Sequence, residues 1–141
     1  MTIKKQVTLS AELGSLPMFR QIIDQVCDQA NVVDQQTRYD LKLAVDEACT
    51  NIILYGYSGM NPGSIILSCE IDELEARLTI TDFGHPFEPV EIDLPDPEAV
   101  PGEGQDELGL FFIHQSCDQM EYESSPAGNN LVLVKFLGKQ D

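Results

Sequence analysis

Two short runs of alternating apolar residues, separated by an acidic turn, constrain the fold of this chain more than any other feature. The first run is apolar at every second position over residues 65–71, and the second repeats this alternation over residues 76–80. Alternation with a period of two is typical of strands that bury one face. Because Asp72 and Glu73 form a short polar turn between the runs, the sequence predicts an antiparallel hairpin.

Two helices are predicted before this hairpin. Apolar residues recur at helical spacing over residues 19–30, after a start at Ser15-Leu-Pro17 in which proline suits the first turn. A second helix follows, because Thr37 with Asp40 three residues later resembles a capping box. We expect this second helix to end near Gly56, where a loop rich in turn-forming residues begins.

The remaining segments complete an α+β pattern. Strands are predicted at residues 5–9, 120–122 and 131–137, and a short helix at residues 108–117. Residues 83–107 are rich in proline and acidic side chains and lack any periodicity, which favours a lid between a strand and a helix. The order β-α-α-β-β-lid-α-β-β predicts one domain, a two-layer α/β sandwich with helices on one face of a mixed, mostly antiparallel sheet.

Composition is that of a globular protein, with 43% hydrophobic and 23% charged residues among 141. No apolar run approaches the roughly 20 residues that cross a bilayer, and the N-terminus lacks the apolar segment of a signal peptide. We therefore expect a cytoplasmic protein without membrane contact. The four cysteines are widely spaced and form no Cys-x-x-Cys pair, so they are expected to be reduced core thiols.

The charge is strongly acidic, with 24 Asp plus Glu against 8 Lys plus Arg and a net charge of −16. Direct binding to nucleic acid is disfavoured, because phosphate binding depends largely on Lys and Arg. Solubility alone explains such a charge. Docking of the acidic surface on a basic protein, such as a transcription factor, is the other interpretation.

One polar pair interrupts the apolar pattern of the second helix. Glu47 and Asn51 are four residues apart and therefore lie on the same helical face. The pair could mark the exposed boundary of an amphipathic helix. It could also form a cation or phosphate site, with Asn51 as an oxygen ligand for Mg²⁺ and Glu47 as a base or water-positioning group.

A second polar motif lies at the end of the hairpin. Asp82 leaves the second hairpin strand, and Gly84 allows the backbone to turn tightly two residues later. Taken alone, Asp-x-Gly is common in turns. The motif becomes specific because it follows the helix with Glu47 and Asn51 and precedes the predicted lid and the Leu108-Gly-Leu segment.

Taken in order, these motifs resemble the GHKL (histidine-kinase-like) superfamily of ATP-binding domains, and in particular the small bacterial anti-sigma-factor serine/threonine kinases. The resemblance runs across nearly the whole chain. Its parts are an N box at Asp46–Asn51 with Tyr55–Tyr57, a first glycine box at Asp82–Phe87, a second at Leu108–Ile113, and C-terminal matches at residues 117–122, 128–129 and 131–136. The resemblance implies the Bergerat (GHKL) ATP-binding fold.

The resemblance also implies a role for each motif in binding ATP. Asp82 would accept a hydrogen bond from the exocyclic amine of adenine, a contact that discriminates strongly because its loss leaves a carboxylate unpaired. Gly84 would let the base approach the backbone. Asn51 would coordinate the Mg²⁺ that bridges the phosphates.

Further implied roles concern transfer of the phosphoryl group. Glu47 would take the proton from, or orient, a serine or threonine hydroxyl of a partner protein. The backbone N–H groups of Gly109 and Leu110, at a helix start, would contact the phosphates. Phosphoryl transfer depends mainly on such positioning and on charge neutralisation.

Two functions are consistent with these motifs. The first is an anti-sigma factor that sequesters a sigma factor and phosphorylates an anti-anti-sigma (STAS-domain) antagonist, with a homodimer as a further expectation from the resemblance. The second is a non-catalytic binding module with weak or no ATP turnover. It is motivated by the acidic pair Asp106 and Glu107 in the lid and by the absence of Lys and Arg from residues 78–134. The charge of a bound nucleotide triphosphate would then be neutralised by Mg²⁺, by backbone donors, or by a cation from Arg38, Lys42 or a partner.

Overall fold

An antiparallel sheet forms one of the two layers of this protein. The computed structural model describes residues 2–30, 33–86 and 117–137. The strands are β1 (Ile3–Ser10), β2 (Ser64–Ile71), β3 (Glu75–Asp82), β4 (Gln119–Ser125) and β5 (Gly128–Phe136). They lie in the order β1-β2-β3-β5-β4, and every pairing among the described strands is antiparallel.

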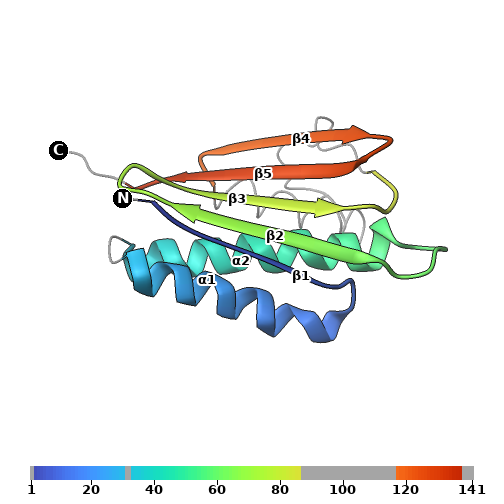
Figure 1. Ribbon diagram of the computed structural model, residues 1–141, viewed down its shortest axis with the longest axis horizontal. Helices are drawn as coiled ribbons and strands as arrows, with labels where there is room; N and C mark the ends of the chain where they lie inside the picture. Colours follow the sequence, from blue (N-terminus) through green and yellow to red (C-terminus); the bar gives the residue numbers. More distant parts are fainter. Residues whose placement is uncertain (1, 31–32, 87–116, 138–141) are drawn as a thin grey trace, which may run out of the picture.

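Two helices form the second layer, and both lie on the same face of the sheet (Figure 1). They are α1 (Leu16–Ala30), preceded by the short 3-10 helix η1 (Leu13–Ser15), and α2 (Gln35–Asn51), continued by the π-helical turn η2 (Ile52–Gly56). The predicted α+β sandwich is therefore confirmed, with a sheet that is antiparallel throughout the described residues. The third helix, predicted at residues 108–117, lies outside them except for its last residue, and residues 87–107 of the lid predicted at residues 83–107 also lie outside them.

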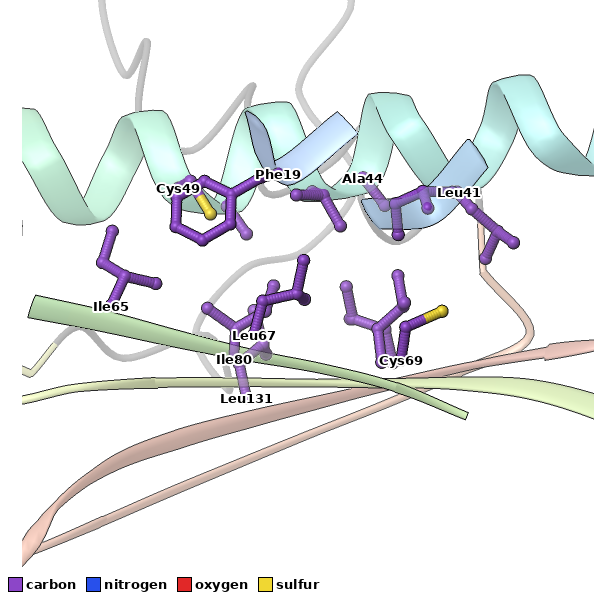
Figure 2. Packing of buried hydrophobic residues seen from close by; sticks show 14 of the residues in the cluster. Phe19, Leu41, Ala44, Cys49, Ile65, Leu67, Cys69, Ile80 and Leu131 are labelled. Carbon is purple, nitrogen blue, oxygen red and sulfur yellow. The ribbon is translucent and has the colours of Figure 1, made fainter. Parts of the chain in front are cut away.

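The core lies between the sheet and the helix pair. Side chains from α1 and α2 point toward the sheet and meet those of β2, β3 and β5 (Figure 2). In β2 the alternation seen in the sequence becomes a strict alternation of buried and half-buried residues. Phe19 of α1, Leu67 of β2 and Ile80 of β3 are all fully buried. Burial of such side chains contributes roughly 1.5–3 kcal/mol each to folding.

The β2–β3 hairpin has the predicted antiparallel pairing and turn. Ile71 pairs with Ala76, and Ile65 pairs with Asp82 at the other end of the hairpin. In the turn, the carboxylate of Asp72 accepts hydrogen bonds from the backbone N–H groups of Leu74 at 2.7 Å and Glu75 at 2.9 Å. This Asx turn fixes the register, and so it places Asp82 at the far end of β3.

The N-terminus of α2 lies before the predicted one. Asp34, in an extended conformation, is the N-cap, and its carboxylate accepts a hydrogen bond from the backbone N–H of Thr37 at 2.8 Å. The capping box predicted at Thr37 and Asp40 is therefore wrong by three residues. Aspartate caps a helix at least as well as threonine. Asp40 instead accepts a hydrogen bond from Gln36 and forms an ion pair with Lys135 at 3.3 Å.

All four cysteines are buried free thiols, as predicted: Cys27, Cys49, Cys69 and Cys117. Burial raises the pKa of Cys27 to about 11, and the pKa values of Cys69 and Cys117 to about 12. Such thiols are core residues with little thiolate at neutral pH. Among the described helices, none combines the length and apolar character needed to cross a membrane.

Candidate functional site

Asn51 is the last residue of α2 and lies at the start of the π-helical turn η2. Its side chain is only 7% exposed, and its Nδ2 is buried without a hydrogen-bond partner among the described residues. A buried amide donor without a partner is costly, so such groups usually mark a place where a ligand or water supplies the acceptor. The exposed helix boundary considered from the sequence therefore does not describe Asn51.

Glu47 lies one turn before Asn51 and is partly buried. Its pKa is raised above the usual value of glutamate, mainly because burial disfavours the charged form and secondly because of the negative charge of Asp46. Asp46 is in turn held by Arg20 of α1, whose Nη1 lies 2.7 Å and 2.9 Å from its two carboxylate oxygens. A carboxylate with a raised pKa is better suited to accept a proton near neutral pH.

Asp82 is the last residue of β3, and only 2% of it is exposed. Its Oδ1 accepts two hydrogen bonds, from Nδ2 of Asn129 at 2.9 Å and from the backbone N–H of Gly84 at 2.8 Å. Burial raises the pKa of Asp82, while these two bonds oppose the rise. The two donors hold one carboxylate oxygen, and the described residues provide no donor for Oδ2.

Gly84 joins this carboxylate to the end of the helix. A Cβ at position 84 would overlap the carbonyl oxygen of Gly56 and would lie 2.6 Å from its carbonyl carbon. The carbonyl of Gly56 also accepts a hydrogen bond from the backbone N–H of His85 at 2.5 Å. Gly84 does not have a positive φ. Glycine is therefore required here by close backbone contact, and not by a left-handed turn conformation.

The π-helical turn η2 presents Gly56 for this contact. The backbone N–H of Tyr57 donates to the carbonyl of Ile52 five residues earlier, at 3.0 Å, which is the hydrogen-bond spacing of a π-helix. The buried Tyr57 hydroxyl donates to the carbonyl of Ser64 at 2.8 Å and accepts from the backbone N–H of Phe83 at 3.0 Å. Tyr57 therefore links the start of β2 to the residue after Asp82.

The sequence-predicted residues divide into two groups. The structure brings Asp82 and Gly84 together, and it connects them through Gly56 to the helix that carries Glu47 and Asn51. The pKa of Cys49 on α2 is raised mainly by burial, and the charges of Asp46 and Asp82 add to this rise. Gly109, Leu110 and the acidic pair Asp106 and Glu107 lie outside the described residues.

Sequence reasoning missed the role of Asn129. It lies on β5 opposite Asp82 in the β3–β5 pairing, and only 2% of it is exposed. Besides its bond to Asp82, its Nδ2 donates to the carbonyl of Gly84 at 2.9 Å. Asparagine in a turn-rich segment gives no strong signal by itself. Only the pairing of the closing strand with β3 could have indicated that it faces a buried carboxylate.

The cations considered as neutralising groups are engaged elsewhere. Arg38 forms ion pairs with Asp24 at 3.2 Å and Asp28 at 2.8 Å, and Lys42 lies 3.1 Å from Asp24. Arg38 lies about 20 Å along α2 from Asn51 at the usual helical rise. These two side chains therefore hold α1 against α2, and both are already engaged by carboxylates of α1.

The residues of the site fit an ATP-bound Mg²⁺ ion. The described residues contain no group of three or more His, Cys, Asp or Glu side chains that could hold a metal. Mg²⁺ in phosphate-binding sites typically takes one or two protein oxygens and completes its shell with phosphate oxygens and water. Asn51 offers such an oxygen, and its partnerless Nδ2 would donate to an acceptor that a ligand supplies.

These features define the class of protein: a two-layer α+β sandwich whose polar site lies between the end of a helix and the end of a central strand. The family model described as the histidine kinase-like ATPase domain matches residues 9–135. Because this match spans most of its length, the chain belongs to the histidine kinase-like ATPase domain family.

Curated relatives extend this result. The chain is 30% identical over 111 residues to the serine-protein kinase RsbW of Halalkalibacterium halodurans, covering 72% of this chain and 64% of that protein. It is also 30% identical over 109 residues to the anti-sigma F factor of the same organism, covering 76% and 73%. The anti-sigma F factor of Clostridium novyi is 28% identical over 97 residues, covering 68% of each chain. The chain thus spans less than two thirds of the RsbW relative.

A solved structure shares the fold. The crystal structure of the RsbU and RsbW domains of Rv1364c from Mycobacterium tuberculosis matches 98% of this chain with a TM-score of 0.69. The match covers 33% of that longer chain at 15% sequence identity. At this identity the likeness demonstrates the common fold alone.

Proposed function

We propose that this protein is an anti-sigma regulator that binds Mg-ATP and phosphorylates a serine or threonine of an anti-anti-sigma (STAS-domain) antagonist while it sequesters a sigma factor. Membership in the histidine kinase-like ATPase family and the names of the relatives, a serine-protein kinase and anti-sigma F factors, support this proposal. The observation that carries it is the buried Asp82, held at one oxygen beside Gly84 and close to the helix with Asn51.

Adenine binds, in this proposal, at the end of β3. Asp82 is a buried carboxylate, and one of its oxygens has no donor among the described residues, so it can accept a hydrogen bond from the exocyclic amine. The close contact of Gly84 with Gly56 keeps the carboxylate in place against the helix end. A base without a donor at that position would leave the Asp82 charge desolvated and unpaired.

The phosphates then lie toward the end of α2. Asn51 would hold Mg²⁺, which when bound neutralises charge on the phosphates. Gly109 and Leu110 would add backbone N–H groups. Arg38 and Lys42 are engaged in ion pairs with α1. This leaves Mg²⁺ and backbone donors as the main neutralising groups, and slow transfer is expected.

Glu47 is the proposed acceptor of the hydroxyl proton. Its raised pKa keeps it a stronger base than an exposed glutamate. Arg20 holds the neighbouring Asp46, which keeps that second carboxylate directed toward α1. Asn51, one turn farther along the same helix, would hold the phosphoryl group close to this base.

Transfer of labelled phosphate from ATP to a candidate STAS antagonist tests the proposal. We expect Glu47→Gln to reduce transfer by about 10²- to 10⁴-fold while Mg-ATP binding is retained. The matched control is Glu70→Gln on β2, a partly buried position that points away from the helices. Unchanged transfer in Glu47→Gln would remove Glu47 from the mechanism. Capture of a sigma factor from cell extract, with and without ATP, tests the regulatory part.

The second candidate is a non-catalytic binding module of the same fold. It is favoured by one observation, namely that Arg38 and Lys42 are committed to ion pairs with α1. Calorimetric titration with Mg-ATP separates the two. If the unmodified protein binds Mg-ATP clearly and Asp82→Asn abolishes this binding, a non-catalytic module that does not bind ATP is excluded. If the unmodified protein does not bind Mg-ATP, the kinase is excluded.

A further inference from the structure

The side chain of Asn129 is fully engaged within the protein. A carboxamide has two N–H donors and one acceptor oxygen. One donor bonds to Oδ1 of Asp82 and the other to the carbonyl of Gly84, both at 2.9 Å. Its Oδ1 accepts a hydrogen bond from the hydroxyl of Ser124 at 2.7 Å. Asn129 therefore has no donor left for a ligand, although it contacts the proposed base-binding carboxylate.

Ser124 adds a third hydrogen bond to the carboxamide of Asn129. Asp82 and Gly84 determine which way the amide faces, because a carboxylate and a backbone carbonyl only accept hydrogen bonds, whereas a hydroxyl can donate or accept. A reversed amide would direct its oxygen at the carboxylate of Asp82, which is repulsive. Ser124 is exposed on β4 and pairs with Asn129 across the β4–β5 ladder. A hydroxyl on an edge strand thus helps to hold a buried amide in place.

We propose that Asn129, held in place by Ser124, is a positioning residue for purine specificity: it holds Oδ1 of Asp82 so that Oδ2 faces the base as an acceptor for the exocyclic amine of adenine. The inference rests on the proposed function, because it requires that Asp82 bind the base. Asn129 itself does not touch the nucleotide. Its effect is to keep a desolvated carboxylate both ionised and fixed in direction.

This arrangement would discriminate between purine bases that differ only in the group on the ring carbon that carries the exocyclic amine in adenine. Inosine triphosphate carries a carbonyl oxygen where ATP carries the exocyclic amine, so it meets Oδ2 with an acceptor. One hydrogen bond to a charged group corresponds to roughly ten- to a hundredfold in affinity. Without Asn129, Asp82 gains freedom to rotate and to take up a proton. A protonated carboxyl donates to inosine as readily as it accepts from adenine, so the preference falls.

Equilibrium binding of Mg-ATP and Mg-inosine triphosphate to the purified full chain tests this. We expect the unmodified protein to prefer ATP by roughly ten- to a hundredfold. Asn129→Ala should lose most of this preference, Ser124→Ala should lose part of it, and Ser124→Thr, which keeps the hydroxyl, should restore it. The matched control is Asn130→Ala. Asn130 accepts a hydrogen bond from Thr81 at 2.6 Å and lies on the opposite face of the same strand.

The pH dependence of ATP binding gives a second readout. Loss of the Asn129 donor removes one of the bonds that lower the pKa of Asp82, so the pH below which binding is lost should move upward. Tyr57 and Cys49 also interact electrostatically with Asp82, but the pKa values of both are raised above their usual values by burial first of all, so neither group titrates in the acidic range in which Asp82 does. A purely structural role for Asn129 would leave this midpoint unchanged.

The outcomes separate the inference from the function beneath it. Equal weakening of both nucleotides in Asn129→Ala and Ser124→Ala, with an unchanged preference and an unchanged pH midpoint, would overturn the positioning role alone. No ATP binding by the unmodified protein would overturn the proposed function and this inference together. A reduced preference in both variants, restored by Ser124→Thr and unaffected by Asn130→Ala, would support it.

Discussion

Replacement of Gly84 by alanine tests the contact that joins the two halves of the site. The new Cβ would overlap the backbone carbonyl of Gly56 and would lie 3.2 Å from the backbone N of Tyr57. Backbone atoms cannot rotate away as a side chain can, so η2 and the end of β3 must separate. Overpacking of this kind typically costs about 1–3 kcal/mol, and loss of the hydrogen bond between His85 and Gly56 adds about 0.5–1.5 kcal/mol.

The expected loss of stability is therefore about 1.5–4.5 kcal/mol. For a chain of 141 residues, the entropy of unfolding is about 0.3 kcal/mol/K, so Tm should fall by about 5–15 °C. Thermal unfolding followed by circular dichroism measures the shift. Because Gly84 also donates to Asp82 at 2.8 Å, Mg-ATP binding should weaken in calorimetric titration of the same variant.

Two other glycines serve as controls for this prediction. Gly14→Ala places a Cβ in open space without a positive φ, so its Tm should stay constant or rise slightly. Gly59→Ala also meets open space, but its φ of 76° should lower stability by about 1–2 kcal/mol. A Gly84→Ala variant with the Tm of Gly14→Ala would refute the argument from backbone contact.

Three further predictions follow from burial and capping. Asp82→Asn should raise Tm at neutral pH, because it removes a desolvated charge. This gain in Tm should shrink as the pH falls toward the aspartate pKa of the unfolded chain, because the pKa of Asp82 is raised in the folded protein and its charged form destabilises the fold only at higher pH. A gain that stays constant from about pH 4, near the usual aspartate pKa, to about pH 7 would contradict this. The rate of phosphate transfer should rise with pH through a midpoint above the usual pKa of glutamate, and Glu47→Gln should abolish that dependence. Asp34→Ala should lower the free energy of unfolding by about 0.5–2 kcal/mol in urea denaturation, whereas Thr37→Ala should cost less.

Much of the fold could be predicted from local patterns. The alternation in β2 and β3 and the helical spacing in α1 survive in the structure because each strand and helix buries one face against a common core. The cap of α2 was missed because two residues, Asp34 and Thr37, both have capping side chains. The choice between them depends on the conformation of the preceding backbone, which local sequence does not specify.

The polar residue types of the candidate site, too, could be identified from the sequence. An aspartate after a strand, a glycine two residues on, and an asparagine in an apolar helix indicated the family of sites. The sequence did not show that Asn51 is buried with its Nδ2 lacking a partner in the described part of the chain, or that η2 is a π-helical turn. Both depend on how the helix end packs against the sheet.

Local sequence was enough to predict the periodicity of the helices and strands, a core with reduced cysteines, and the polar groups of the candidate site. The packed fold was needed to show which of these groups meet. Asn129 reaches Asp82 across 47 positions of sequence, and Gly84 is required because Gly56 approaches it. The physical reason is that period and propensity arise among neighbouring residues, whereas register and close backbone contact exist only once distant segments have packed together.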